Sequence, residues 1–218
     1  MDFDKVLKSR HSVRQFSDKK IDEMTLFDLI ESAQSSPSWV NAQEVGAVVA
    51  IGDRLEQMRI KHAELNADDK VKSQPIIPYR PIHEWPEPAQ SNMKEWFQSV
   101  TDALGDQGSE KLGQTGNQLY QAQAVVYLTL PKDSSNWSLV DLGIFAQTLM
   151  LAATNKGIGS IPAYQYVQYP EQLGEALELP IDRVPILGIG LGYFDDKEPL
   201  NQIRSKRMKK EDMLTIKD

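Results

Sequence analysis

The sequence predicts an α+β fold in which a mixed sheet is flanked by helices. Three short apolar, β-branched runs, at 45–52, 124–131 and 184–193, are typical of buried strands. They lie far apart in a chain of 218 residues, and stretches of helical periodicity separate them. No linker-like segment divides the chain, so we expect a single domain over 1–218.

Helices are predicted where apolar side chains recur at spacings of three and four residues. These stretches are 2–8, 21–35, 54–65, 92–105 and 138–157. The last is apolar nearly all round, which indicates either a central core helix or a helix in a subunit interface. Ser138 is its expected N-cap, with Asp141 three residues on, and Gly157 is its expected end.

Composition excludes several classes of protein and site. Hydrophobic residues make up 40% of the chain and charged residues 25%, which is ordinary for a soluble globular protein. The chain has no cysteine, and its three histidines are too scattered for a metal site, so none is expected. A net charge of -7 argues against nucleic acid as a partner. The charged start and the lack of a spanning apolar run predict a cytoplasmic protein with no membrane partner.

The region from 66 to 105 is the least regular part of the sequence. Its first two thirds contain five prolines between 75 and 88 and little periodicity, which indicates a long loop or flap. Such a loop, rich in Trp, Tyr and Pro, is either a lid over a site or a surface excursion. A charged C-terminal tail is expected over 196–218.

Two short basic clusters stand out in this acidic chain. In "RHSVR", Arg10, Ser12 and Arg14 alternate, so in an extended segment they point to the same side and could grip a phosphate. In "RSKR", Arg204 and Arg207 could bind an anion as well. Taken separately, each cluster is better explained as a solvated surface.

The remaining polar motifs are weaker. The loop "SPSWVNAQ" at 36–43 carries side-chain amides suited to reading a heterocycle edge, although a plain polar turn explains them too. The glycines at 157–159 and 188–192 do not form a dinucleotide-binding fingerprint, because no strand leads through them into a helix. No nucleophile elbow or phosphate-binding lysine loop is present, so an enzyme of this sequence would rely on a bound cofactor.

Four segments, taken in order, resemble the nitroreductase family of FMN-dependent oxidoreductases. They are "RHSVRQFSDKKID", "SPSWVNAQ", "DLGIFAQTLMLAATNKGIGSIP" and "LGIGLGYFDDKEPLNQIRSKR". Each motif is modest, but the set spans most of the chain in the family's order. The resemblance implies a nitroreductase-like fold that forms an interlocked homodimer with FMN at the subunit interface.

The resemblance also implies which residues hold FMN. Arg10, Ser12 and Arg14 would grip its phosphate side, and Arg207, with Arg204 or Lys206, would close on the same phosphate. The backbone of Ala163 or Tyr164 would lie near flavin N5, where an N–H donor stabilises the reduced flavin. The full expected set is Arg10, His11, Ser12, Arg14, Pro37, Ser38, Trp39, Asn41, Gln43, Pro162, Ala163, Tyr164, Gln165, Arg204, Lys206 and Arg207.

By the same resemblance, the activity is NAD(P)H-dependent. Hydride would pass from NADH or NADPH through flavin N5 to a nitroaromatic or quinone in a ping-pong scheme. The flap matches none of the family's motifs, and we expect it to set substrate choice. No catalytic side chain is expected. Alternatives are another FMN-dependent reaction, such as dehalogenation, flavin destruction or enoate reduction, and a flavin-binding protein without turnover. A module that binds anions or nucleic acid through both basic clusters is a further alternative.

Overall fold

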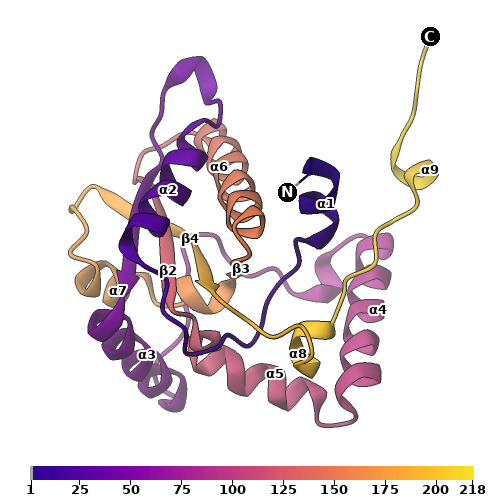
Figure 1. Cartoon of the computed structure of the whole chain (residues 1–218), viewed down its shortest axis with the longest axis horizontal. Coiled ribbons are helices and arrows are strands. Elements are labelled where there is room, and N and C mark those ends of the chain that lie inside the picture. Colours follow the sequence, from indigo (N-terminus) through magenta and orange to yellow (C-terminus); the bar gives the residue numbers. More distant parts are fainter. Residues whose placement is uncertain (1) are drawn as a thin grey trace.

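A computed structural model describes residues 2–218 (Figure 1). The helices are α1 Phe3–Ser9, α2 Glu23–Gln34, α3 Gly52–Ala67, α4 Glu87–Leu104, α5 Gly108–Asn117, α6 Asn136–Asn155, α7 Pro170–Ala176, α8 Pro199–Gln202 and α9 Lys210–Met213. The strands are β1 Gly46–Ile51, β2 Ala124–Pro131, β3 Gly159–Ala163 and β4 Arg183–Gly192. Single turns of 3₁₀ helix lie at Trp39–Asn41, Ile82–Glu84, Leu119–Gln121 and Tyr164–Val167.

The four strands form one antiparallel sheet in the order β1-β2-β4-β3. An isolated parallel bridge between Ser12 and Ser160 adds the N-terminal segment beside β3. The backbone N–H of Val13 donates to the carbonyl of Ser160 at 3.0 Å across this bridge. The predicted α+β class, with a central sheet flanked by helices, is therefore confirmed.

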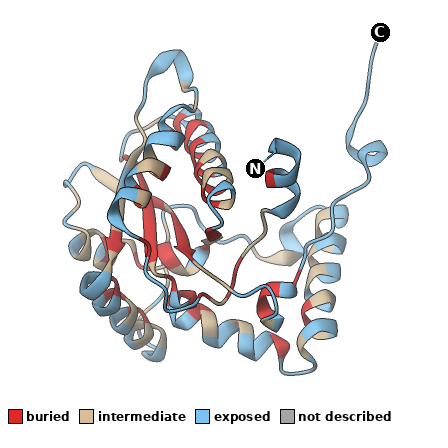
Figure 2. Cartoon of the chain, viewed as in Figure 1, coloured by how far each residue is buried: buried red, intermediate tan, exposed pale blue. Residues whose placement is uncertain are grey.

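The core lies on both faces of the sheet. Strand β2 is buried on both sides, so apolar and polar residues do not alternate along its sequence. Val126 and Leu128 pack in one apolar cluster with Leu149 of α6. Tyr127 points to the opposite face and packs with Leu55 of α3. Figure 2 shows buried residues concentrated in the sheet and along α6, whereas α3 and α4 are exposed over much of their surface.

Helix α6 is longer at its start than predicted. The residue at its N-cap position is Ser135, and Ser138 is buried inside the helix, where its hydroxyl donates to the Glu44 carboxylate. The expected end is right: Gly157 has φ 74, and the following N–H of Ile158 returns to the Ala153 carbonyl, as in a Schellman motif. Among residues 2–218, α6 alone is long and apolar enough to cross a membrane, but core helices pass the same test.

Besides the single-turn helices α8 and α9 of the tail, three elements were not expected from the sequence. Strand β3 contains Gly159 and Pro162, which made the segment look like a loop, but as an edge strand it tolerates proline. Helix α5 has three glycines and few apolar side chains, so its periodicity is weak. Helix α7 is only seven residues long and begins at Pro170, a position where proline is preorganised for helix.

The expected flap and tail have partial structure. Residues 68–86 are irregular apart from one 3₁₀ turn, and α4 begins at Glu87, earlier than the predicted 92. Val100 of α4 packs with Leu200 and Ile203, so a separate small cluster attaches the start of the tail. Beyond it, the C-terminal segment extends away from the body of the protein (Figure 1).

Candidate functional site

The N-terminal basic segment is fixed in place by backbone pairing at two points. Val13 bonds to β3 as described, and Arg14, which is 6% exposed, donates its backbone N–H to the Asn201 side-chain oxygen at 2.8 Å. Gln15 donates its N–H to the same oxygen at 3.1 Å. This segment therefore carries its arginines on a rigid backbone at the edge of the sheet.

Asn201 of α8 is the residue that joins the two ends of the chain. It is fully buried, and its amide nitrogen donates to the carbonyls of Gln15, at 2.8 Å, and Asp195, at 3.0 Å. All of its hydrogen-bonding groups have partners, which a buried amide requires. Sequence reasoning missed Asn201, because one asparagine beside a basic tail carries no signal of burial.

The two basic clusters meet in the fold. Burial lowers the pKa of the Arg10 guanidinium, and nearby Arg207 lowers it further. Burial also lowers the pKa of Arg14, against an opposing effect of Tyr120, and nearby Arg204 adds to the lowering. Each arginine of the N-terminal cluster thus lies close enough to an arginine of the C-terminal cluster to feel its charge.

This gathering of positive charge is only partly neutralised. Arg204 pairs with Asp196 at 3.3 Å. Among residues 2–218, no carboxylate pairs with Arg10, Arg14 or Arg207. The Arg14 guanidinium instead donates to the backbone carbonyl of Ser12, two residues earlier, at 3.1 Å. Arg14 is buried, Arg10 is half-buried and Arg207 is exposed. Guanidiniums without carboxylate partners are the donors that bind a phosphate dianion well.

Lys206 and His11 stand apart from this set. The Lys206 ammonium is held by Glu95 of α4 at 2.7 Å, and this hydrogen bond raises its pKa. The His11 ring bonds through Nδ1 to the Ser9 carbonyl at 2.8 Å, and its Nε2 lies 3.7 Å from Asp196. Burial is the largest cause of the lowered pKa of His11, so the ring is predominantly neutral. Lys206 therefore has a carboxylate partner already, whereas Nε2 of His11 is buried without a hydrogen-bond partner among the described residues.

The loop at 36–43 is compact and strained. Gln43 donates its backbone N–H to the Ser38 hydroxyl at 3.1 Å and its side-chain amide to Asn41 at 2.9 Å. Val40, Asn41 and Gln43 have φ angles of 45, 61 and 51, in the left-handed region. For a β-branched valine this conformation is an outlier, and such strain gathers at functional sites. The expectation of an ordered polar loop is thus met, with more strain than a plain turn requires.

Within one chain, this loop does not meet the arginines. Trp39 donates its N–H to Asp141 of α6 at 3.0 Å and stacks on Trp137, with ring centroids 4.5 Å apart. The N-terminal basic segment instead lines a cavity with Thr154, near the other end of the same helix. Thr154 lies thirteen positions after Asp141, which corresponds to about 20 Å along the helix, so the loop and the basic segment of one chain lie near opposite ends of α6.

The segment from Pro162 to Gln165 ends β3 and begins a 3₁₀ turn, Tyr164–Val167. Ala163 is buried, while the Tyr164 side chain is 38% exposed. The Gln165 carboxamide accepts a hydrogen bond from the Tyr120 hydroxyl at 3.0 Å. Because Tyr120 also senses the charge of Arg14, this turn lies beside the basic cluster.

Comparison with known proteins identifies the family. The family model described as "Nitroreductase family" matches residues 7–193, which is most of the chain. The chain belongs to the nitroreductase family. The resemblance to this family inferred from the sequence is confirmed; the matched range includes Arg10 and Arg14, whereas Arg204 and Arg207 lie beyond it.

Similar nitroreductases include proteins of known activity and structure. A 4-nitrobenzoate reductase of Pseudomonas putida is 26% identical over 212 residues, which cover 94% of this chain and 91% of that protein. Nitroreductase NfnB of Mycolicibacterium smegmatis is 29% identical over 209 residues, with 94% and 88% covered. A crystal structure of FMN-dependent NfnB from Mycobacterium smegmatis in complex with NADPH superposes with a TM-score of 0.90 at 27% identity, covering 99% of this chain and 97% of that one.

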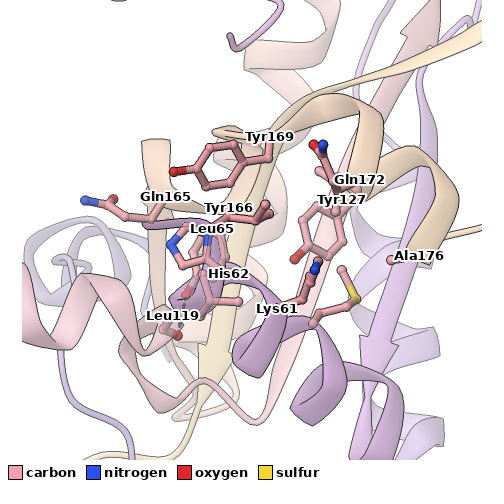
Figure 3. Close-up of a pocket in the computed structure, with 12 residues that line it drawn as sticks. Lys61, His62, Leu65, Leu119, Tyr127, Gln165, Tyr166, Tyr169, Gln172 and Ala176 are labelled. Carbon is pink, nitrogen blue, oxygen red and sulfur yellow. Dashed lines mark hydrogen bonds between the residues drawn. The ribbon is translucent and has the colours of Figure 1, made fainter. Parts of the chain in front are cut away.

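This nitroreductase also has a small cavity of about 50 Å³ on the α3 side of the sheet (Figure 3). His62 lies in it under Tyr169, with ring centroids 5.7 Å apart. Burial alone lowers the pKa of His62 to about 4. Of the residues expected to bind the cofactor, only Gln165 lines this cavity, so it is distinct from the arginine cluster.

Proposed function

We propose that this nitroreductase is an FMN-dependent oxidoreductase that uses NADH or NADPH to reduce nitroaromatic or quinone-type acceptors. The observation that carries the proposal is the meeting of Arg10, Arg14 and Arg207, without carboxylate partners, at the edge of the sheet. For Arg14, which is buried, and Arg10, which is half-buried, a positive charge without a counter-ion is costly, and the FMN phosphate would supply the missing negative charge.

The residues present fit FMN. Arg10, Arg14 and Arg207 would hold the phosphate. Both Arg204 and Lys206 have carboxylate partners, but Arg204 is the better candidate for the further contact, because it lies close enough to Arg14 to lower the pKa of that guanidinium. Ser12 lies on the same fixed segment and would add a hydroxyl. When Arg204 turns to the phosphate, its bond to Asp196 is exchanged for a second charge-assisted one.

The proposed functional unit is a homodimer. The strained loop at 36–43, which by resemblance contacts the flavin, lies far along α6 from the arginines of its own chain, so a second copy would have to provide it. The exposed apolar side chains near this loop support such an interface: Trp39, Val40, Trp137, Leu139, Val140 and Ile144. Contiguous apolar surface of this kind is typical of subunit contacts.

Bound FMN would supply the redox chemistry, in which N5 accepts hydride from NAD(P)H and delivers it to the acceptor in a ping-pong sequence. The residues of this chain would position the flavin and polarise its N5 atom. The backbone N–H of Ala163 or Tyr164 is the proposed donor near N5. Burial, opposed by Arg14, raises the pKa of Tyr120 to about 12, so its hydroxyl stays protonated at neutral pH and holds the Gln165 amide in place.

Nitroaromatic acceptors are proposed from the relatives, since the Pseudomonas putida protein is named for 4-nitrobenzoate and NfnB is named a nitroreductase. Protons would come from water, because Tyr120 and Tyr166, which lie beside or within the turn at 162–167, have raised pKa values and are therefore weak proton donors. A cytoplasmic location, where NAD(P)H is available, is part of the same proposal.

The direct test is to purify the protein, record its visible spectrum and identify the released chromophore. FMN at about one per subunit, together with NAD(P)H oxidation that depends on an added nitroaromatic or quinone, is the expected result. A flavin without turnover would indicate a binding protein. A colourless protein that takes up no added FMN would contradict the proposal.

The phosphate assignment is tested by substitution. Arg14→Ala and Arg207→Ala should each weaken FMN binding about tenfold or more, because each removes a charge-assisted contact. Riboflavin, which lacks the phosphate, should bind all variants equally. Lys210→Ala is the matched control, since it removes a charge from the same tail at a residue that pairs only with its neighbour Glu211. Wild-type FMN affinity in both arginine variants would refute the assignment.

A further inference from the structure

The turn that follows Ala163 is held in place by Tyr166, which packs against β4. The Tyr166 side chain lies across β4: a Cβ on Gly188 would come within 2.2 Å of the Tyr166 Cβ, and a Cβ on Gly190 within 2.0 Å of its hydroxyl oxygen. Its hydroxyl donates to the Leu119 carbonyl at 3.2 Å, as the dashed line in Figure 3 shows. Only glycine leaves room for the ring at these positions, so the turn has little freedom to move.

A second set of hydrogen bonds clamps the far end of the turn. Asn66 lies at the end of α3. Its side-chain oxygen accepts hydrogen bonds from the Tyr169 hydroxyl at 2.7 Å and from the Gln168 side-chain amide at 3.1 Å. Its amide nitrogen bonds to His62 at 2.9 Å and to Asn117 at 3.1 Å. One asparagine thus ties α3, α5 and the turn together, with all of its polar groups used.

The flap loop, residues 68–86, is attached to this fixed turn. The backbone N–H of Gln74 donates to the Gln168 carbonyl at 3.2 Å, and the Ser73 hydroxyl donates to the same carbonyl at 3.3 Å. Because the hydroxyl proton of Ser73 is used in this way, the Tyr164 hydroxyl donates to the Ser73 oxygen. The Tyr79 ring also meets the Tyr164 ring edge-on, with centroids 6.3 Å apart.

The flap loop contributes little packing of its own. Tyr79 is 66% exposed, and Ile76, Ile77 and Trp85 are exposed as well. A segment with few buried contacts opens at low free energy, so a single hydrogen bond has a large share in holding it. The bond between Ser73 and Tyr164 is therefore a latch between a loose loop and a rigid turn.

We propose that Tyr164 determines acceptor specificity: its hydroxyl latches Ser73, and the flap loop so held admits flat one-ring acceptors and hinders bulky ones. The inference rests on the proposed function, which places the backbone of Ala163 or Tyr164 beside flavin N5. An acceptor stacked there would lie under the side chains of Tyr164 and Tyr79. Opening the latch would then widen the entrance without altering the flavin.

Hydrogen–deuterium exchange of the purified protein measures the latch without reference to activity. Tyr164→Phe removes one hydroxyl and should raise exchange in peptides covering 72–80 about fivefold, the population shift that corresponds to one ordinary hydrogen bond. Ser73→Ala should raise it at least as much. In the double variant, Tyr164→Phe should add nothing to Ser73→Ala, because the bond is already gone.

Tyr169→Phe is the matched control. It removes the same atom from the same turn, but its hydroxyl bonds to Asn66 and not to the flap loop. Exchange in the 72–80 peptides should stay within twofold of wild type. An equal rise in this control would show general loosening of the turn and would overturn the latch, as would unchanged exchange in Tyr164→Phe.

The specificity half is tested by steady-state kinetics with 4-nitrobenzoate and a three-ring quinone sulfonate. In Tyr164→Phe, kcat/KM for the quinone relative to 4-nitrobenzoate should rise about fivefold, mainly through KM, with wild-type FMN content. An unchanged ratio despite faster exchange would overturn the specificity role. Failure of FMN to bind would instead contradict the proposed function and leave the exchange result standing as a test of the latch.

Discussion

His62 should make a large contribution to the loss of stability of this protein at low pH. It is 7% exposed, its ring packs against Tyr169, and Asn66 donates to its Nε2. Burial lowers its pKa from 6.5 to about 4. The unfolded chain therefore binds the proton more readily than the folded one, so this contribution is present above pH 6.5 and lost as the pH falls toward 4. The shift corresponds to about 3 kcal/mol in full, of which about 2 kcal/mol is lost between pH 7 and pH 4.5.

Urea unfolding at pH 7 and pH 4.5, at one protein concentration, measures this loss. His62→Gln keeps an acceptor for Asn66 but cannot be protonated, so its free energy of unfolding should fall by about 2 kcal/mol less than that of wild type over this range. His11 and the carboxylates titrate in both proteins and cancel in the difference. Parallel pH profiles for the two proteins would refute the reasoning, and so would an NMR titration that places His62 near 6.5.

Three further substitutions test other parts of the structure. Asn201→Ala should lower the free energy of unfolding by about 3 kcal/mol in urea, since it leaves buried N–H groups of the N-terminal segment without an acceptor, and it should weaken FMN binding. An unchanged dissociation constant for FMN would contradict its role in assembling the site. Gly190→Ala should cost about 2 kcal/mol and lower Tm by a few degrees, because the new methyl group displaces the Tyr166 ring. An unchanged Tm would mean that the ring is not held there. Val40→Glu, at a side chain 85% exposed, should change unfolding of the isolated chain by under about 0.5 kcal/mol but raise the dimer dissociation constant about tenfold in sedimentation, and unaltered association would place the interface elsewhere.

Much of the fold could be predicted from the sequence because, in most of the long helices and strands, the apolar side chains recur at the spacing typical of that element. Strand β2 and helix α6 are strongly apolar, and their burial on the sheet explains that composition. Strand β3 could not be found, because its pairing with β4 and its bridge to Ser12 are contacts between distant segments. The start of α6 was misplaced because Ser135 and Ser138 both suit an N-cap, and only the tertiary contact of Ser138 with Glu44 distinguishes them.

The site was predictable in its charges and not in its geometry. Arg10, Arg14, Arg204 and Arg207 were singled out as cations, and the fold brings them together. The sequence could not show that Lys206 is held by Glu95, since that partner lies on α4, 111 positions earlier in the chain. Nor could it show the bonds of Asn66 or Asn201, whose importance comes entirely from burial and from partners supplied by distant elements.

The position of Asn201 has a consequence for how the protein is made. The N-terminal arginines leave the ribosome first, but the amide that fixes their backbone and the arginines that complete the cluster come almost a whole chain later. A chain released early could fold its sheet and still lack a place for the phosphate. FMN would then bind only after Arg207 has been synthesised, so that only completed chains would carry out redox turnover.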